Sequence, residues 1–293
     1  MSTPPTPIPF STNSLTSLLF HDAVADIILR SSDNEMFHVH KLVLSKGSPV
    51  FRDMFSLPQG PPSDDKSISI IQMTEDAKAL CILLYHIYPD TPGSIVDTFA
   101  SFSDIRRGLE VSRKFQMSRL QEQLRLTLLS RVKEAAESVF AISWEYQIKD
   151  VVQAAARETL RRPLLMGGKV AEFAFIPATA VQNLLRYQRR CIDSIPKISP
   201  VLPFDPAWMY QFHQSICSSL CAFPHPDTVR EPSVVSLATS AILKVFPHAI
   251  IDKFTIDQYI KDSTLLIEAK LSKVRPLIPP ESGQSSNDLP DPN

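Results

Sequence analysis

The chain has 293 residues, of which 44% are hydrophobic and 21% are charged, proportions that are ordinary for a globular protein and exclude wholesale disorder. Its 30 basic and 31 acidic residues give a net charge of −1, so no global field attracts nucleic acid or an anionic membrane. Only 7 glycines accompany 25 prolines, and the common glycine-containing motifs that bind phosphate or present a nucleophile do not occur in the sequence. We therefore expect no enzymatic activity, no catalytic residues and no cofactor.

The cysteines and the N-terminus predict the compartment. Four cysteines, at positions 81, 191, 217 and 221, are too few and too unevenly spaced for a disulfide framework, which predicts reduced thiols. The N-terminus has neither the basic start nor the apolar core of a signal peptide, and no stretch approaches the ~18 apolar residues of a membrane helix. We expect an intracellular, soluble protein of the cytoplasm or the nucleus, with no membrane partner.

The chain begins and ends with polar, proline-containing stretches. Residues 1–17 predict a flexible segment and residues 276–293 predict a disordered tail, because neither can bury enough apolar surface to become ordered. Residues 24–30 form a nearly continuous apolar run, which predicts a strand buried on both faces. A turn cluster at 31–34 and an alternating run at 36–40 then predict a hairpin.

Short helices and a third strand follow the hairpin. Ser48 is expected to cap a helix that has Pro49 at its first position. The alternation of Ile68 and Ile70 predicts the third strand, and Thr74 is expected to cap the next helix. Residues 18–130 are thus predicted to form a three-stranded sheet packed with helices.

From residue 103 onward the apolar residues recur with helical spacing, and no strand signal of comparable strength occurs after residue 71. We predict an α+β fold class, in which the N-terminal domain is followed by an all-α helical domain over residues 131–275. The predicted helical segments of that second domain are 134–143, 148–161, 177–193, 206–221, 233–246 and 256–272.

The spacing over residues 25–55 resembles the opening of the BTB/POZ domain family. The family pattern has an aspartate in the first strand, an apolar-x-x-His-Lys/Arg motif at the end of the second, and then x-Val-Leu-x-x-x-Ser-x-x-Phe. A later stretch at 86–89, His-Ile-Tyr-Pro, is similar to another motif of the family. The residues that carry the first resemblance are Asp26, Phe37, His40, Lys41, Val43, Leu44, Ser48 and Phe51.

The second half resembles the helical extension that follows BTB domains in many fungal proteins. The residues that carry this looser resemblance are 140–141, 154–163, 184–191 and Trp208. No zinc finger, kelch repeat or MATH domain is recognisable in the sequence, so no reader module with a known ligand is fused to the two halves.

The resemblance implies a homodimer and thus a protein–protein interaction module that recruits a further partner. Large apolar residues near the start of the chain make association plausible independently, because surplus apolar surface usually ends in an interface. Asp26 and Lys41 match positions that line a pocket at the family's dimer interface; the alternative is a solvated surface pair. Phe51 is expected at the interface or, alternatively, in the core of the monomer. The predicted interface residues are Leu15, Leu18, Leu19, Phe20, Asp26, Lys41 and Phe51.

Many proteins of this family are substrate adaptors of cullin ubiquitin ligases, and their contact uses an apolar-x-Glu motif in the helix before Ile-Tyr. Here Leu80-Cys81-Ile82 occupies that place, so Ile82 stands where the glutamate would be and an acidic contact is missing. A cullin adaptor and a transcriptional co-regulator without its own DNA-binding domain are the alternative functions. The predicted partner groove comprises Leu80, Ile82, Tyr85 and Tyr88.

One group of possible metal ligands occurs in the second half. His213, Cys217, Cys221 and His225 are spaced by four residues, but the first and last would lie ~18 Å apart on a continuous helix, too far to share one ion. We therefore expect a buried stripe of thiols and no metal.

Residues 103–190 contain sixteen Lys or Arg and nine Asp or Glu. A basic face would suit an acidic partner or nucleic acid, but the positive charges are spread over several helices without interleaved aromatic residues, so we expect solvated helix faces and no nucleic acid. No small-molecule substrate is expected either.

Overall fold

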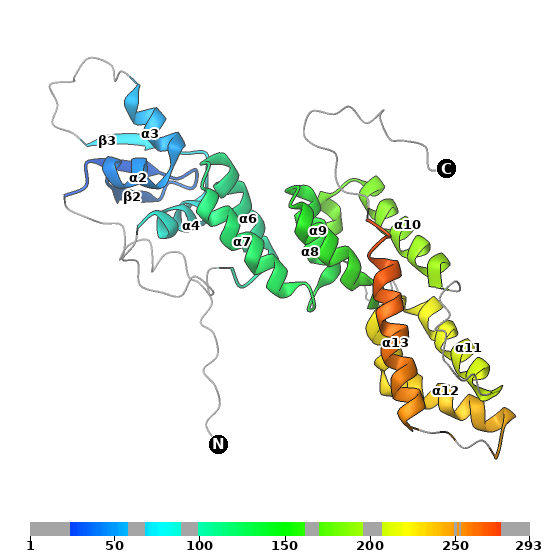
Figure 1. Ribbon diagram of the computed structural model, residues 1–293. Coiled ribbons are helices and arrows are strands. Elements are labelled where there is room, and N and C mark those ends of the chain that lie inside the picture. The colour runs from blue at the N-terminus through cyan, green and yellow to red at the C-terminus, as the bar shows by residue number, and fades with distance from the viewer. Residues whose placement is uncertain are drawn as a thin grey trace. The chain divides into compact units, whose positions relative to one another are not determined.

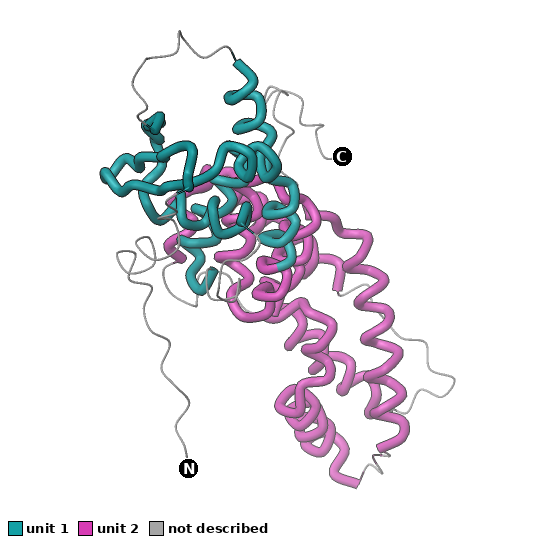
Figure 2. The backbone as a smooth tube through the Cα atoms, turned by 90° about the vertical axis from the view of Figure 1, so that its left-hand side faces the viewer, with its two compact units in different colours: residues 1–126 teal, residues 127–293 magenta. Residues whose placement is uncertain are grey.

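The computed structural model describes residues 24–57, 68–88, 99–161, 170–195, 207–248, 251 and 253–276. The chain divides into two compact units, residues 1–126 and residues 127–293, shown in different colours in Figure 2. The predicted flexible segment 1–17 and, apart from Pro276, the predicted tail 276–293 lie outside the described residues. None of the described helices is long and apolar enough to cross a bilayer.

The first unit contains a three-stranded sheet of mixed direction, labelled in Figure 1. Strand β1 (Ile27–Arg30) lies in the centre, pairs antiparallel with β2 (Met36–Val39) and pairs parallel with β3 (Ser69–Gln72). The turn between β1 and β2 places Asn34 at φ 71°, a left-handed conformation that asparagine tolerates. The predicted hairpin and third strand are confirmed.

Only one face of the sheet is fully buried. Ile27 and Leu29 of β1 are buried, whereas Ile28 and Arg30, which point to the other face, are half-buried. Ile70 of the edge strand β3 is 56% exposed. The prediction of a first strand buried on both faces was wrong, because the described elements cover only the face that carries Ile27 and Leu29.

The hydroxyl of Ser48 connects two distant parts of the first unit. It caps α3 by accepting a hydrogen bond from the backbone N–H of Phe51, as predicted, and it also donates to the carbonyl of Phe115 at 2.8 Å. The helices of this unit, the last of which continues past residue 126, are α2 (Lys41–Gly47), α3 (Pro49–Ser56), α4 (Ala77–Ile87), α6 (Phe102–Lys114) and α7 (Ser118–Arg131).

Asp76, and not Thr74, caps helix α4. The Asp76 carboxylate accepts the backbone N–H of Ala79 at 2.8 Å. The hydroxyl of Thr74 instead accepts a hydrogen bond from the ammonium of Lys114 at 2.6 Å, and the helix starts three residues after Thr74. The predicted cap was wrong because a contact with a residue far along the chain engages the threonine.

The second unit has helices and no strand among its described residues, as predicted for the all-α part of the fold (Figure 1). Helices α8 and α9 pack on each other, as do α11 and α12, and α13 packs against η4 and α10. The elements are α8 (Ala136–Glu145), α9 (Lys149–Glu158), η1 (Thr159–Arg161), η2 (Ala171–Phe175), α10 (Ala178–Ser194), α11 (Ala207–Ala222), η4 (Pro226–Arg230), α12 (Pro232–Val245) and α13 (Lys253–Leu271).

Candidate interaction site

Asp26 and Lys41 lie together where the chain leads into β1 and where α2 begins. The Asp26 carboxylate accepts the backbone N–H of Lys41 at 2.8 Å. This N–H belongs to the first turn of α2 and has no partner inside the helix, and a carboxylate at a helix N-terminus is also favoured by the helix dipole. Within the described part of the chain the Lys41 ammonium forms no ion pair, so the two residues meet through the backbone.

His40, the residue before Lys41, is held from the opposite side. The backbone N–H of His40 donates to the hydroxyl of Tyr88 at 2.8 Å, and Nδ1 of the His40 ring lies 3.4 Å from the same oxygen. Tyr88 directly follows α4, so the end of one helix contacts the start of another. Asp26 and Tyr88, which the sequence analysis assigned to different sites, therefore bind consecutive residues of one turn.

Two large apolar side chains lie beside this turn and face solvent. Val24 is 79% exposed and Leu42 is 66% exposed. We call Val24, Asp26, Lys41 and Leu42 the β1–α2 surface. The sequence analysis missed Val24 and Leu42, although the three consecutive apolar residues 42–44 at the start of a helix were a signal, because they cannot all face the core.

The other predicted interface residues lie elsewhere. Phe51 is 1% exposed and stacks on Phe55 and Phe115, with ring centroids 5.9 and 5.1 Å away. It fills the core of the first unit, which was the alternative interpretation. Leu15, Leu18, Leu19 and Phe20 lie outside the described residues.

The side chains of the predicted groove residues point in two directions from α4. Leu80 and Ile82 are buried in the core, whereas Tyr85 and Tyr88 are half-buried. Cys81 shares the outward face with the two tyrosines, and burial together with nearby acidic groups raises the pKa of its thiol to about 12. The part of α4 that a partner can reach in this conformation is therefore the face of Cys81, Tyr85 and Tyr88.

Hydrogen bonds and ion pairs fix the N-terminal end of α4. The Asp33 carboxylate, in the turn between β1 and β2, accepts the backbone N–H of Ala77 at 2.9 Å. On the other side, Lys78 forms an ion pair with Asp104 of α6 at 2.6 Å. Burial opposes ionisation of Asp104, but hydrogen bonds from Lys78 and Ser101 outweigh it and hold the pKa of the carboxyl below its ordinary value. The N-terminal end of α4 is thus anchored both to the turn between β1 and β2 and to α6.

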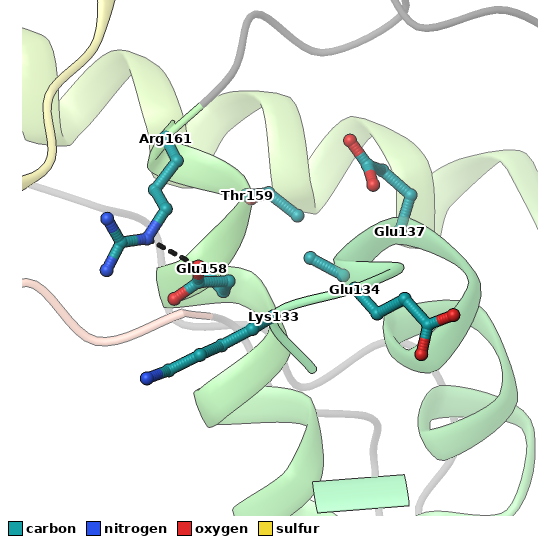
Figure 3. A pocket seen from close by; sticks show the side chains of 7 residues that line it. Lys133, Glu134, Glu137, Glu158, Thr159 and Arg161 are labelled. Atoms are coloured by element: carbon teal, nitrogen blue, oxygen red, sulfur yellow. Dashed lines mark ion pairs between the residues drawn. The ribbon is translucent and has the colours of Figure 1, made fainter. Parts of the chain in front are cut away.

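The second unit has a polar hollow of about 270 Å³, which Figure 3 shows from close by. Arg161 pairs with Glu158 inside it and with Asp227 beyond it. The side chains of Lys133 and Glu134 extend in different directions (Figure 3), so the polar groups do not converge on a common point. Nothing in this arrangement positions an acid, a base or a nucleophile for a reaction.

A smaller and mainly apolar hollow of about 210 Å³ contains part of the predicted cysteine stripe. Cys217 Sγ lies 3.4 Å from Nε2 of His213, whose Nδ1 lies 2.5 Å from the hydroxyl of Tyr259. Cys221 is exposed and His225 lies beyond the end of α11, so the prediction of one buried stripe was wrong; the helix ends at Ala222, before Pro224. No three His, Cys, Asp or Glu side chains are grouped for a metal ion in the described ranges.

Comparison with known families assigns the first part of the chain. Residues 15–132 match the family model of the BTB/POZ domain. This segment is therefore a BTB/POZ domain, a class of domain that mediates protein–protein interaction. No curated protein matches the chain, and the resemblance of the second half to fungal helical extensions stays a prediction.

Proposed function

We propose that the protein is an interaction module that forms a homodimer through its BTB/POZ domain and recruits a second protein. The observation that carries this proposal is the exposure of Val24 and Leu42 beside the hydrogen bond between Asp26 and Lys41. Neighbouring exposed apolar side chains are typical of interfaces, and the BTB/POZ match gives the class of interaction. The four untested residues between 15 and 20 are proposed to extend the same interface.

The β1–α2 surface suits a symmetric contact on energetic grounds. Burying an exposed valine or leucine completely contributes about 1.5–3 kcal/mol each, and a twofold interface uses each side chain twice. Asp26 already accepts a backbone N–H, and this hydrogen bond offsets part of the cost of covering its carboxylate. Apolar side chains around a hydrogen-bonded polar group are the pattern of an interface with a fixed register.

The molar mass of the full chain in solution tests the proposal. Sedimentation equilibrium at about 1–50 µM, which brackets ordinary micromolar affinities, is expected to give a dimer for the unmodified chain. Val24→Glu and Leu42→Glu are expected to give monomers with an unchanged circular dichroism spectrum. Leu237→Glu is the matched control, because Leu237 in α12 is 64% exposed, and it should remain dimeric. A monomeric unmodified chain, or dimers that survive both substitutions, would refute the proposal.

A cullin is the second candidate partner, and the observation that favours it is the outward face of α4. Tyr85, Tyr88 and Cys81 are half-buried there, so an apolar helix of a partner could cover them without unfolding the domain. Ile82 is buried, so the position of the family's acidic residue does not offer a contact. Substitution of Leu80 or Ile82 would damage the core and is uninformative. Capture of a purified cullin that is lost with Tyr85→Ala supports this role, and absence of capture by the unmodified chain excludes it.

A further inference from the structure

Six exposed basic side chains lie on three elements of the second unit. One is on α9, two are one helical turn apart on α10, and three are at the C-terminal end of α13 and directly after it. We call this set the basic patch, and its members are Arg157, Arg186, Arg190, Lys270, Lys273 and Arg275.

Contacts within the second unit bring these elements together. The guanidinium of Arg190 donates to the backbone carbonyl of Arg275 at 2.8 Å, which joins α10 to the segment after α13. The side-chain amide of Gln188 on α10 donates to the backbone carbonyl of Thr159 at 3.0 Å, which joins α10 to the end of α9 near Arg157. The charges of both Arg157 and Arg190 act on the thiol of Cys191. Figure 1 shows the end of α13 reaching α10. The elements that carry Arg157, Arg190 and Arg275 therefore meet, and the other three members follow on the same elements, although the six span residues 157–275 of the sequence.

The basic patch lacks acidic partners. No member of the set forms an ion pair with a carboxylate in the part of the chain that the structure describes. Neighbouring arginines differ in this respect, since Arg189 pairs with Asp193 at 3.2 Å and Arg161 pairs with Glu158 and Asp227. Like charges gathered without counter-charges repel one another, and an anion placed among them relieves that repulsion.

We propose that the basic patch binds an acidic segment of a partner protein. Four of the six cations are arginines, whose planar guanidinium binds a carboxylate through two parallel hydrogen bonds. Single-stranded nucleic acid fits less well, because its bases need exposed aromatic rings to stack on. Tyr187 is the one aromatic residue in α9, α10 and residues 270–276, and it is buried. The proposal adds a binding surface beyond the BTB/POZ domain.

Fluorescence anisotropy of the full chain with a labelled ten-residue polyglutamate peptide tests this surface. The double variant Arg186→Glu/Arg190→Glu is expected to weaken binding about tenfold or more at low salt, and raising the salt concentration should weaken binding by the unmodified chain. Lys270→Glu/Lys273→Glu should give the same loss, and neither of its lysine side chains makes a hydrogen bond within the described residues. This second variant decides the matter if the first one does not fold by circular dichroism.

The matched control is Lys244→Glu/Lys261→Glu, which changes the net charge equally at exposed positions outside the basic patch. It is expected to change the affinity by less than about twofold, apart from a small general effect of net charge. Binding of the full chain to a thymidine oligonucleotide and to phosphatidylserine vesicles is measured in the same way, to distinguish an acidic peptide from nucleic acid and from an anionic membrane. No binding of the peptide, an equal loss in the control, or tighter binding of the oligonucleotide or the vesicles would each overturn the proposal.

Discussion

His225 should make the stability of the second unit depend on pH. Its side chain is 8% exposed, and its Nδ1 accepts the backbone N–H of Asp227 at 3.1 Å, which caps η4. Burial, aided by the nearby charge of Arg161, lowers its pKa from 6.5 to about 4 despite the opposing charge of Asp227. The substitution His225→Asn tests this dependence, because an asparagine keeps an acceptor at the cap and does not titrate.

Proton linkage gives the direction and the size of the pH effect that His225 has on the free energy of unfolding. Between pH 4 and 6.5 the unfolded chain binds a proton at His225 and the folded chain does not, so the free energy of unfolding falls as the pH is lowered through this window. Above pH 6.5 the contribution is fully present. A difference of about 2.5 pKa units corresponds to about 3 kcal/mol of stability lost across this window.

Guanidinium chloride unfolding followed by tryptophan fluorescence measures this contribution. The chain has two tryptophans, Trp144 and Trp208, and both are buried in the second unit, so the signal reports on that unit. Carboxylates titrate in the same range, and the relevant quantity is therefore the difference in pH dependence between the unmodified chain and His225→Asn. His248→Asn, at an exposed position after α12, is the control and should keep the full dependence. Identical pH dependences for the unmodified chain and His225→Asn would refute the reasoning.

Three further predictions concern single positions. Gly108→Ala should destabilise the first unit by about 1–3 kcal/mol in thermal unfolding, because the added Cβ would lie 2.7 Å from the ring of Phe99; the gain that helix propensity alone predicts would contradict this. Asp26→Ala should cost about 0.5–2 kcal/mol by removing the acceptor of the Lys41 N–H at the start of α2, and Asp26→Asn should restore most of it; equal losses in both would show that this hydrogen bond is unimportant. Brief alkylation at neutral pH, analysed by mass spectrometry, should modify the exposed Cys221 before Cys81, whose pKa is raised to about 12, and equal rates would contradict the burial described.

Local signals in the sequence were sufficient where one short segment decides the structure. The turn at 31–34 joins two strands by itself, and the cap at Ser48 needs only the backbone N–H of Phe51. The helices of the second unit follow apolar periodicity and begin and end within about three residues of their predicted positions.

Local sequence signals failed where a residue far along the chain determines the structure. Thr74 and Asp76 are both good caps, and contacts with Lys114 and Arg107 select between them. Motif alignment assigned Ile82 to a partner, but the phase of α4 in the packed domain turns Cys81 outward instead. The basic patch could not be predicted either, because its members are separated along the chain and meet only when α10 and α13 pack together.

The two hydrogen bonds of Ser48 also bear on how the domain can be divided. The Ser48 hydroxyl that caps α3 donates its own hydrogen bond to the carbonyl of Phe115, 67 residues further along the chain. A truncated fragment that stops before Phe115 leaves the buried serine without its acceptor and removes the ring that stacks on Phe51. Fragments meant to isolate the sheet and its first helices therefore have to extend beyond α6, however complete the strands appear without it.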